Sequence, residues 1–260
     1  MNYGFFDYKY NIQGFSSDLF STPHIVFIVL AFISAVLIAA FTSKTKKSTV
    51  EKFLKIASVA VAVFEITKIT WESYYDITTG QGFNTGGILP LYTCSVFIYS
   101  LIVAAWTKGK TKEIALSFLT TVSLISGAIG VVQCNGLNYY PFWTFGAFYS
   151  MFFHYAMLAT GVFLLGSGYK KLEWKDALLS FVAVFAVSIA AIPVNYIVGS
   201  DYMLVYSAGG VPFMSSLADK MAAVGLRPLF TVIMLLTYIP LAAIVVAVYK
   251  GIVFLIKKRG

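Results

Sequence analysis

Long apolar runs recur along almost the whole chain, and they constrain its fold more than any other feature. Seven runs of about 20 residues, separated by short polar connections, take up nearly all 260 residues. A helix crosses a bilayer core with about 20 apolar residues, at ~1.5 Å rise per residue. The runs are continuous and do not alternate, which disfavours a β-barrel. The sequence therefore predicts one all-α domain, 1–260, built as a polytopic bundle of transmembrane helices.

The charge content indicates that lipid surrounds these runs. Only 12% of the residues are charged and 59% are hydrophobic, whereas soluble domains carry roughly a quarter charged residues. Too few charged side chains remain to solvate a soluble globule of this size. The predicted spans are residues 23–41, 53–75, 87–107, 113–132, 142–165, 174–198 and 226–249.

Basic residues occupy every second connection between these spans. Those connections and the C-terminal tail hold Lys44, Lys46, Lys47, Lys52, Lys108, Lys110, Lys112, Lys170, Lys171, Lys175, Lys250, Lys257, Lys258 and Arg259. Because lysine and arginine mark cytoplasmic loops, the pattern predicts seven spans, an outer N-terminus and a cytoplasmic C-terminus. It also accounts for the net charge of +8. We therefore expect a multi-pass protein of the cell membrane, with membrane lipids and not nucleic acid as its partners.

Ionisable side chains inside a predicted span are costly in lipid and mark candidate functional positions. The second span carries Glu65, Lys68 and Glu72, whose spacings of three and four residues place them on one helix face. They form either a structural ion-pair stripe or the polar wall of a cavity inside the bundle. Trp71 lies next to this face and is expected to line the same space.

Two reactive side chains are predicted between the middle of the membrane and its outer edge. Cys94 lies near the start of the third span and His154 near the middle of the fifth. Cys94 is either a small core residue or a nucleophile, and His154 is either a structural hydrogen-bonding group or a general base. The polar residues predicted around the same outer rim are Asn195, Asp201 and Arg227.

Sequence motifs for common cofactors and metals are absent. The chain has no GxSxG, HExxH or P-loop motif, and its seventh span lacks the lysine that a retinal Schiff base requires. Its two histidines, His24 and His154, are predicted at different depths and make a poor pair of haem ligands. We therefore expect no cofactor and no metal.

The run Leu89-Pro90-Leu91-Tyr92-Thr93-Cys94-Ser95 resembles the YwaF-like family of integral membrane proteins, which includes the mammalian transmembrane protein 164. That family carries a Leu-Pro-Leu-His-x-Cys-Ser run, a histidine two spans later, an asparagine late in the sixth span and a short Asn-Tyr-Leu-like run. The matching positions here are Cys94, His154, Asn195 and Asp201-Tyr202-Met203-Leu204. Two positions depart from the pattern, because Tyr92 replaces the first histidine and Asp201 replaces the late asparagine.

The resemblance implies a phospholipid acyltransferase in which Cys94 accepts the acyl group and His154 acts as its base. Three functions stay open: this thiol-dependent enzyme, with a Cys-His pair in an outward-opening cavity; a proton-coupled transporter of small solutes; and a non-catalytic lipid-binding protein. Tyr92 favours the last, since tyrosine is a far weaker base than histidine at neutral pH. The residues expected to bind substrate are Glu65, Lys68, Trp71, Glu72, Tyr92, Asn195, Asp201 and Arg227.

Overall fold

The computed structural model describes residues 3–12, 14–80, 82–84, 87–208 and 212–259, and every regular element among them is a helix. This confirms the all-α prediction for the described part of the chain. The chain separates into two compact units. The first unit contains residues 1–82 and 123–171, and the second contains residues 83–122 and 172–260. The expected single domain stays a prediction, and each unit is described by itself.

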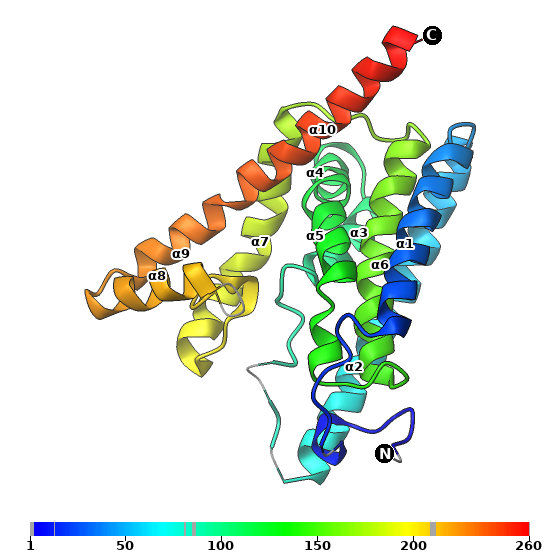
Figure 1. Cartoon of the computed structure of the whole chain (residues 1–260). Helices are drawn as coiled ribbons and strands as arrows, with labels where there is room; N and C mark the ends of the chain where they lie inside the picture. Colours follow the sequence, from blue (N-terminus) through cyan, green and yellow to red (C-terminus); the bar gives the residue numbers. More distant parts are fainter. Residues whose placement is uncertain (1–2, 13, 81, 85–86, 209–211, 260) are drawn as a thin grey trace. The chain divides into compact units, whose positions relative to one another are not determined.

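The first unit is built around α6 (Phe145–Gly166). Its other elements are α1 (Thr22–Phe41), α2 (Lys47–Thr78), α5 (Val122–Val132) and the 3-10 turns η1 (Lys9–Asn11) and η2 (Asn135–Asn138). Helices α1 and α2 both pack against α6 (Figure 1). A hydrogen bond of 2.9 Å between the Ser34 and Tyr155 hydroxyls joins α1 to α6, and the Tyr149 hydroxyl donates to Glu65 on α2.

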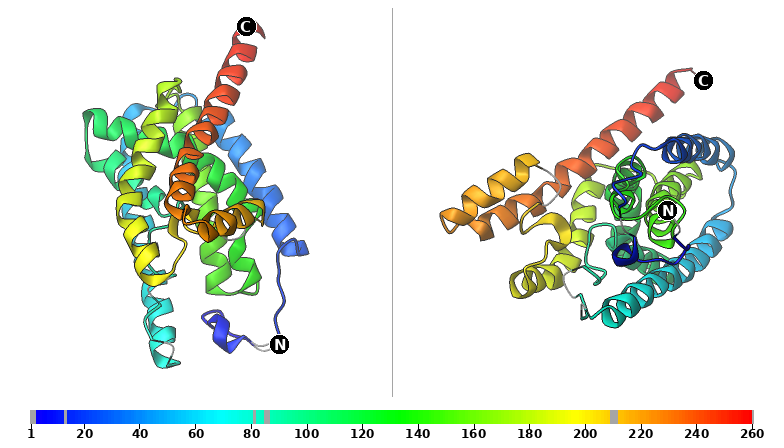
Figure 2. Two further views of the ribbon diagram at one scale, coloured as in Figure 1. Left: turned by 90° about the vertical axis from the view of Figure 1, so that its left-hand side faces the viewer. Right: turned by 60° about the horizontal axis from the view of Figure 1, so that its bottom comes forward.

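The second unit is built around α7 (Lys175–Val198). Its other elements are α3 (Val96–Trp106), α4 (Gly109–Thr120), η3 (Tyr202–Leu204), α8 (Pro212–Ala223), α9 (Arg227–Leu236) and α10 (Tyr238–Arg259). Helices α4 and α10 pack on α7, and α8 packs on α9 (Figure 2). The Ser117 hydroxyl donates to the buried Asp176 carboxylate at 2.6 Å, which ties α4 to α7.

Five helical stretches of the described chain are long and apolar enough to cross a membrane. They are residues 22–41, 109–138, 145–166, 175–198 and 227–258. Helix α2 is long enough, but Lys55, Glu65 and Lys68 interrupt its apolar sequence. Helix α3 has only 11 residues. The second and third spans therefore stay predictions, while the multi-pass class is established by the other five.

The predicted start of the third span is wrong, because α3 begins only at Val96. Residues 89–95 form successive tight turns, in which the Ser95 N–H donates to the Tyr92 carbonyl at 2.9 Å. Pro90 has no N–H to contribute to a helix and disfavours helical backbone at the preceding residue. The apolar sequence of the third run therefore begins before helix α3 does.

The predicted fourth and seventh spans are each divided into two helices. Thr121 has non-helical dihedrals (φ −125°, ψ −89°) between α4 and α5, and its hydroxyl donates to the Ser117 carbonyl at 2.7 Å. Thr237 lies between α9 and α10 with helical dihedrals (φ −62°, ψ −21°), so this division is milder, and its hydroxyl donates to the Met234 carbonyl at 2.5 Å. Side-chain hydroxyls that hydrogen-bond to carbonyls of the preceding turn compete with the main-chain hydrogen bonds of a helix and bend it. Apolar length alone could not indicate either break.

Lipid as the surrounding medium also explains the surface of α1. The large apolar side chains exposed along this helix are Ile25, Val26, Val29, Leu30, Phe32, Ile33, Val36, Leu37 and Phe41. Soluble monomers rarely expose continuous apolar patches of this extent, because water makes them costly. In a bilayer the same side chains meet acyl chains and carry no such cost.

His24 has a structural role in the first unit. Its Nδ1 accepts the Phe20 N–H at 3.0 Å, and its Nε2 lies 3.1 Å from the Val131 carbonyl. Since Nδ1 accepts a hydrogen bond, the proton of the neutral ring is on Nε2, which donates to that carbonyl. The fully buried ring thus satisfies two backbone groups at the start of α1 and the end of α5.

We expect His24→Phe to destabilise the first unit by about 2–4 kcal/mol, because it leaves two backbone groups without partners. Thermal unfolding of the purified protein in detergent measures this change. The matched variant Phe20→Ala alters an exposed side chain beside the same backbone and should shift the midpoint much less. An unchanged midpoint for His24→Phe would show that the ring is not needed there.

Candidate functional site

Cys94 lies in the turns that lead into α3. It precedes the helix by two residues, is half-buried and is not part of a disulfide. Its carbonyl accepts the Phe97 N–H at 3.1 Å, so its backbone is fixed by the first turn of α3. A thiol outside a regular helix and short of full burial is accessible to a substrate in a way that a packed core cysteine is not.

A chain of hydroxyl hydrogen bonds runs beside this thiol. Tyr238, at the start of α10, donates its hydroxyl proton to the Met203 carbonyl at 3.0 Å. It therefore accepts the proton of the Thr93 hydroxyl, which lies 2.5 Å away. Cys94 follows Thr93 directly in the chain, so this hydrogen bond lies beside the Cys94 backbone. The structure thus brings Cys94 together with Tyr238, a residue that the sequence analysis did not select.

The loop that receives this hydrogen bond has a strained backbone. Met203, Leu204 and Ala208 all have positive φ, at 61°, 56° and 50°. Residues with a Cβ rarely adopt this conformation and pay roughly 1–3 kcal/mol each for it. Such strain persists only where surrounding contacts over-determine it, and it is concentrated at functional sites.

Asn195, one of the predicted site residues, supplies contacts that hold this loop. Its Oδ1 accepts the Tyr202 N–H at 2.8 Å and the Ser200 hydroxyl at 3.0 Å, and its Nδ2 donates to the Tyr202 carbonyl at 2.9 Å. The Thr231 hydroxyl adds a bond of 2.9 Å to the Val205 carbonyl. Asn195 is fully buried, so it acts as an internal clamp.

We expect Asn195→Leu to destabilise the second unit by roughly 3–5 kcal/mol, because it leaves three buried polar groups unsatisfied. Asn195→Asp keeps the acceptor oxygen and should fall between wild type and the leucine variant. Thermal unfolding and the rate of proteolysis within residues 201–208 provide the readout. A leucine variant as resistant as wild type would contradict the clamp.

The predicted rim residues Asp201 and Arg227 lie in the same unit as Cys94. The Asp201 carboxylate accepts the Tyr206 and Ser207 N–H groups, each at 2.9 Å, which closes the loop after η3. The Arg227 guanidinium lies over the Tyr206 ring, 4.1 Å from its centroid. The Arg227 guanidinium thus stacks on an aromatic ring, and its N–H donors point outward from the edge of the guanidinium plane.

Tyr92, a predicted substrate-binding residue, lies in the turns before α3 and packs against η3. Its ring lies 4.7 Å from the Tyr202 ring, edge to face. The Tyr202 hydroxyl accepts the Leu89 N–H at 3.1 Å, which links η3 to the turns before α3. The second unit therefore contains Cys94 and the predicted residues Tyr92, Asn195, Asp201 and Arg227.

His154 lies in the first unit, on α6. Its Nδ1 is 2.7 Å from the Ser150 carbonyl, an acceptor, so Nδ1 carries the proton and Nε2 is the basic nitrogen. The ring packs directly against Gly130 of α5, where a Cβ would overlap it. The neutral imidazole thus keeps Nε2 unprotonated, on the side of the ring that packs against Gly130. Its pairing with Cys94 stays a prediction.

The charged face of α2 is paired within the first unit. Lys68 forms an ion pair of 2.7 Å with Glu72, and the buried Glu65 accepts the Tyr149 hydroxyl. The Lys68 ammonium also lies 5.8 Å from the centroid of the Tyr149 ring. Trp71 donates its indole N–H to the Phe6 carbonyl at 2.8 Å. These contacts fit a structural stripe, and the substrate-binding role of Glu65, Lys68, Trp71 and Glu72 stays a prediction.

Cys134 is a second thiol that the sequence analysis left aside. It is fully buried, and its sulfur lies 3.4 Å from the Ser150 hydroxyl. It packs in a cluster with Tyr8, Leu137 and Tyr140. Complete burial among apolar side chains makes Cys134 a core residue, and this distinguishes it from Cys94.

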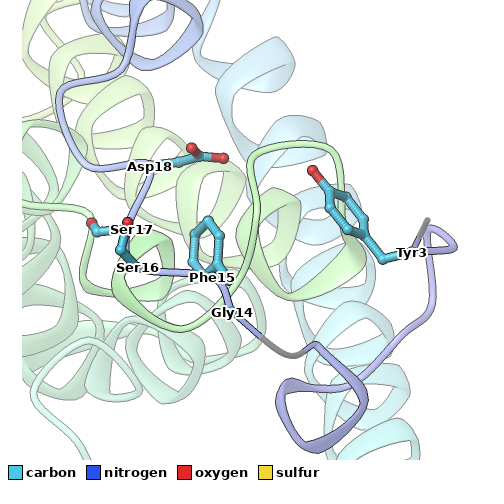
Figure 3. A pocket seen from close by; sticks show the side chains of 6 residues that line it. All are labelled: Tyr3, Gly14, Phe15, Ser16, Ser17 and Asp18. Atoms are coloured by element: carbon cyan, nitrogen blue, oxygen red, sulfur yellow. The ribbon is translucent and has the colours of Figure 1, made fainter. Parts of the chain in front are cut away.

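A small hollow of about 310 Å³ opens in the N-terminal segment, between Tyr3 and residues 14–18 (Figure 3). Two of its polar side chains bind the turns before α6: the Ser17 hydroxyl donates to Asn138 at 2.9 Å, and the Asp18 carboxylate accepts the Phe142 N–H at 2.7 Å. These contacts fasten the segment to the turns before α6. Nothing in the hollow resembles a nucleophile with its base.

The helical fold, the five membrane-crossing stretches and the lipid-compatible surface define a multi-pass α-helical membrane protein. The model of the TMEM164 family matches residues 19–238, so the chain belongs to the TMEM164 family. This confirms the expected relationship to transmembrane protein 164. No curated protein and no solved structure matches the chain.

Proposed function

We propose that the protein is a thiol-dependent phospholipid acyltransferase in which Cys94 is the acyl acceptor and His154 the general base. The observation that supports it most is the position of Cys94, half-buried in the turns before α3 and next to the strained loop that Tyr238 and Asn195 hold. Membership of the TMEM164 family supports the same assignment.

The proposed reaction has two transfers. The Cys94 thiol loses its proton to His154 Nε2, and the thiolate attacks the ester carbonyl of a phospholipid. The C–O bond breaks, the leaving lysolipid oxygen takes the proton back, and the acyl group stays on sulfur as a thioester. The hydroxyl of a second lysolipid then attacks the thioester while His154 accepts its proton, and the thiol is restored when that proton returns to sulfur.

In this proposal the remaining site residues bind and position the lipid. Arg227, stacked on Tyr206, offers donors and positive charge for the lipid phosphate. Tyr92 and Tyr202 form an aromatic wall beside the acyl chain. Tyr92 takes no proton in the reaction, because a tyrosine hydroxyl is a poor base at neutral pH.

A transport function has less support than acyl transfer. Its candidate path was the charged face of α2, where Lys68 and Glu72 pair with each other and Glu65 binds Tyr149. A path for protons or solutes needs groups that exchange partners with the cargo. We therefore do not assign a transport function to this face.

We also infer seven spans in the cell membrane, with the N-terminus outside and the C-terminus in the cytoplasm. The support is the alternation of lysine-rich connections and the presence of helices α2 and α3 at the two remaining apolar runs. Glycosylation acceptor sites placed in the N-terminal segment and after residue 260 test the topology. The proposal requires modification of the first site and none at the second.

The test of the enzymatic proposal is capture of the thioester. Purified protein is mixed with vesicles of phospholipid carrying a labelled acyl chain, quenched in acid and examined for label on the protein. We expect label that neutral hydroxylamine removes and that peptide mass analysis assigns to Cys94. Lipid bound without covalent label, even with an added lysolipid acceptor, would replace the enzyme by a non-catalytic lipid-binding protein.

A further inference from the structure

The N-terminal segment and the last turns of α2 form a dense cluster of aromatic and acidic side chains within the first unit. We call it the aromatic–acidic cluster, and its members are Tyr8, Tyr10, Trp71, Glu72, Tyr75, Asp76 and Tyr140. The Tyr8 ring lies at its centre, stacked on Tyr75 at 5.4 Å and edge to face with Trp71 at 5.1 Å. The proposed acyl transfer uses none of these residues for chemistry.

Asp76 is the unexplained member of this cluster. It belongs to α2, is fully buried and is not among the predicted site residues. Its carboxylate interacts with the Tyr10 hydroxyl, but neither oxygen receives a hydrogen bond of regular geometry from any described residue. A buried carboxylate without a partner is costly, and proteins normally compensate it with a cation.

The positive charges near Asp76 act on another carboxylate. Lys68 forms its ion pair with Glu72 at 2.7 Å, and the Lys9 ammonium also acts on Glu72. Asp76 forms no ion pair with any described residue. A cation is therefore the kind of ligand that its carboxylate would bind.

The surrounding rings indicate which kind of cation fits. The Lys9 ammonium lies 5.2 Å from the centroid of Tyr8 and 5.3 Å from that of Tyr10, so these rings already hold an ammonium group. No group of three metal-ligating side chains occurs in the described chain. Burial and the charges of Glu72 and Asp76 raise the pKa of the Tyr8 hydroxyl, which keeps that ring neutral.

We propose that the aromatic–acidic cluster binds a small organic ammonium cation, with Asp76 as its counter-ion and the Tyr8, Tyr10 and Trp71 rings as its walls. Such a group is available as free choline or ethanolamine and as the headgroup of phospholipids that carry them. Quaternary and primary ammonium groups are bound in proteins by aromatic rings in this way. Lys9 is the chain's own ammonium at the same rings and competes with the ligand.

Thermal unfolding of the full-length protein in detergent, titrated with choline or ethanolamine chloride against sodium chloride at equal ionic strength, tests the site. We expect both amines to raise the midpoint and sodium to leave it unchanged. Asp76→Asn should weaken the effect roughly tenfold or more, while Asp219→Asn, at an exposed carboxylate on α8, should preserve it. Lys9→Gln should strengthen it several-fold.

A second variant protects the test against misfolding of Asp76→Asn. Tyr10 is 41% exposed, so Tyr10→Leu should fold and weaken ammonium binding roughly threefold. Nanodiscs of choline, ethanolamine or glycerol phospholipid then show whether the ligand is free or a headgroup. An equal response to sodium, an Asp76→Asn or Tyr10→Leu protein that responds like wild type, or no response to either amine would overturn the proposal. Labelling of Cys94 is unaffected by that result, so the two proposals fail independently.

Discussion

Replacement of Cys94 by serine is expected to reduce acyl transfer by roughly a thousandfold or more, because loss of a covalent nucleophile removes the intermediate through which the reaction proceeds. A serine hydroxyl is a much weaker nucleophile at neutral pH than a thiol that a base can deprotonate. Cys94 is half-buried and lies outside a regular helix, so the substitution should leave the fold intact. The measurement is the initial rate of labelled acyl transfer between phospholipid and lysolipid in vesicles.

Two companion variants separate chemistry from folding. Cys134→Ala removes the other thiol of the chain, which is fully buried and has no role in the reaction, so the variant should retain activity within a few-fold. His154→Gln can keep a donor for the Ser150 carbonyl but has no basic nitrogen, so it should lose activity while remaining folded. Full activity in Cys94→Ser would remove the enzymatic proposal.

Substitution of Gly127 is expected to have the largest effect on stability. A Cβ at this position of α5 would lie 2.6 Å from the Leu158 nitrogen and 2.8 Å from the His154 carbonyl oxygen of α6. Both are backbone atoms, so no side-chain rotation can relieve the overlap and the two helices must separate. We expect Gly127→Ala to cost roughly 3 kcal/mol or more. Gly127→Leu should yield no monodisperse protein.

Gly251 provides the matched control, because it is also a helical glycine but a Cβ there meets nothing within 4 Å. Gly251→Ala should be neutral or stabilise the protein by up to ~1 kcal/mol, since alanine has the higher helix propensity. The unfolding midpoints of the two alanine variants provide the comparison. Equal midpoints would mean that α5 and α6 do not approach as closely as described.

The helical class and the membrane environment could be predicted from sequence because both depend on local apolar length and on charge content. Residues 23–41 were predicted as the first span, and α1 occupies 22–41. The helix breaks at Thr121 and Thr237 could not be predicted in the same way. They depend on hydroxyl bonds to the preceding turn, which a hydropathy pattern does not contain.

The candidate site could be predicted only in part. Cys94, Asn195 and Asp201 were selected from a motif, and the structure places them in one unit. Tyr238 could not be predicted as a site residue, because a tyrosine in an apolar run is common in membrane helices. Its importance follows from the hydrogen bonds of its hydroxyl with Thr93 and Met203, which only the folded chain shows. Asp76 lies one residue beyond the predicted second span, 53–75, and its burial could not be predicted because it depends on the N-terminal segment that packs beside it.

Composition, run length and a short motif are properties of neighbouring residues, so they sufficed to predict a helical membrane protein related to transmembrane protein 164. The role of each polar group depends instead on how the chain folds. The tertiary structure made Asn195 a loop clamp, placed the proton of the neutral His154 ring on Nδ1 and buried Asp76 with no hydrogen bond of regular geometry from the described residues. The physical reason is that a hydrogen bond or an ion pair forms between residues distant in sequence, and their spacing along the chain does not determine whether they meet.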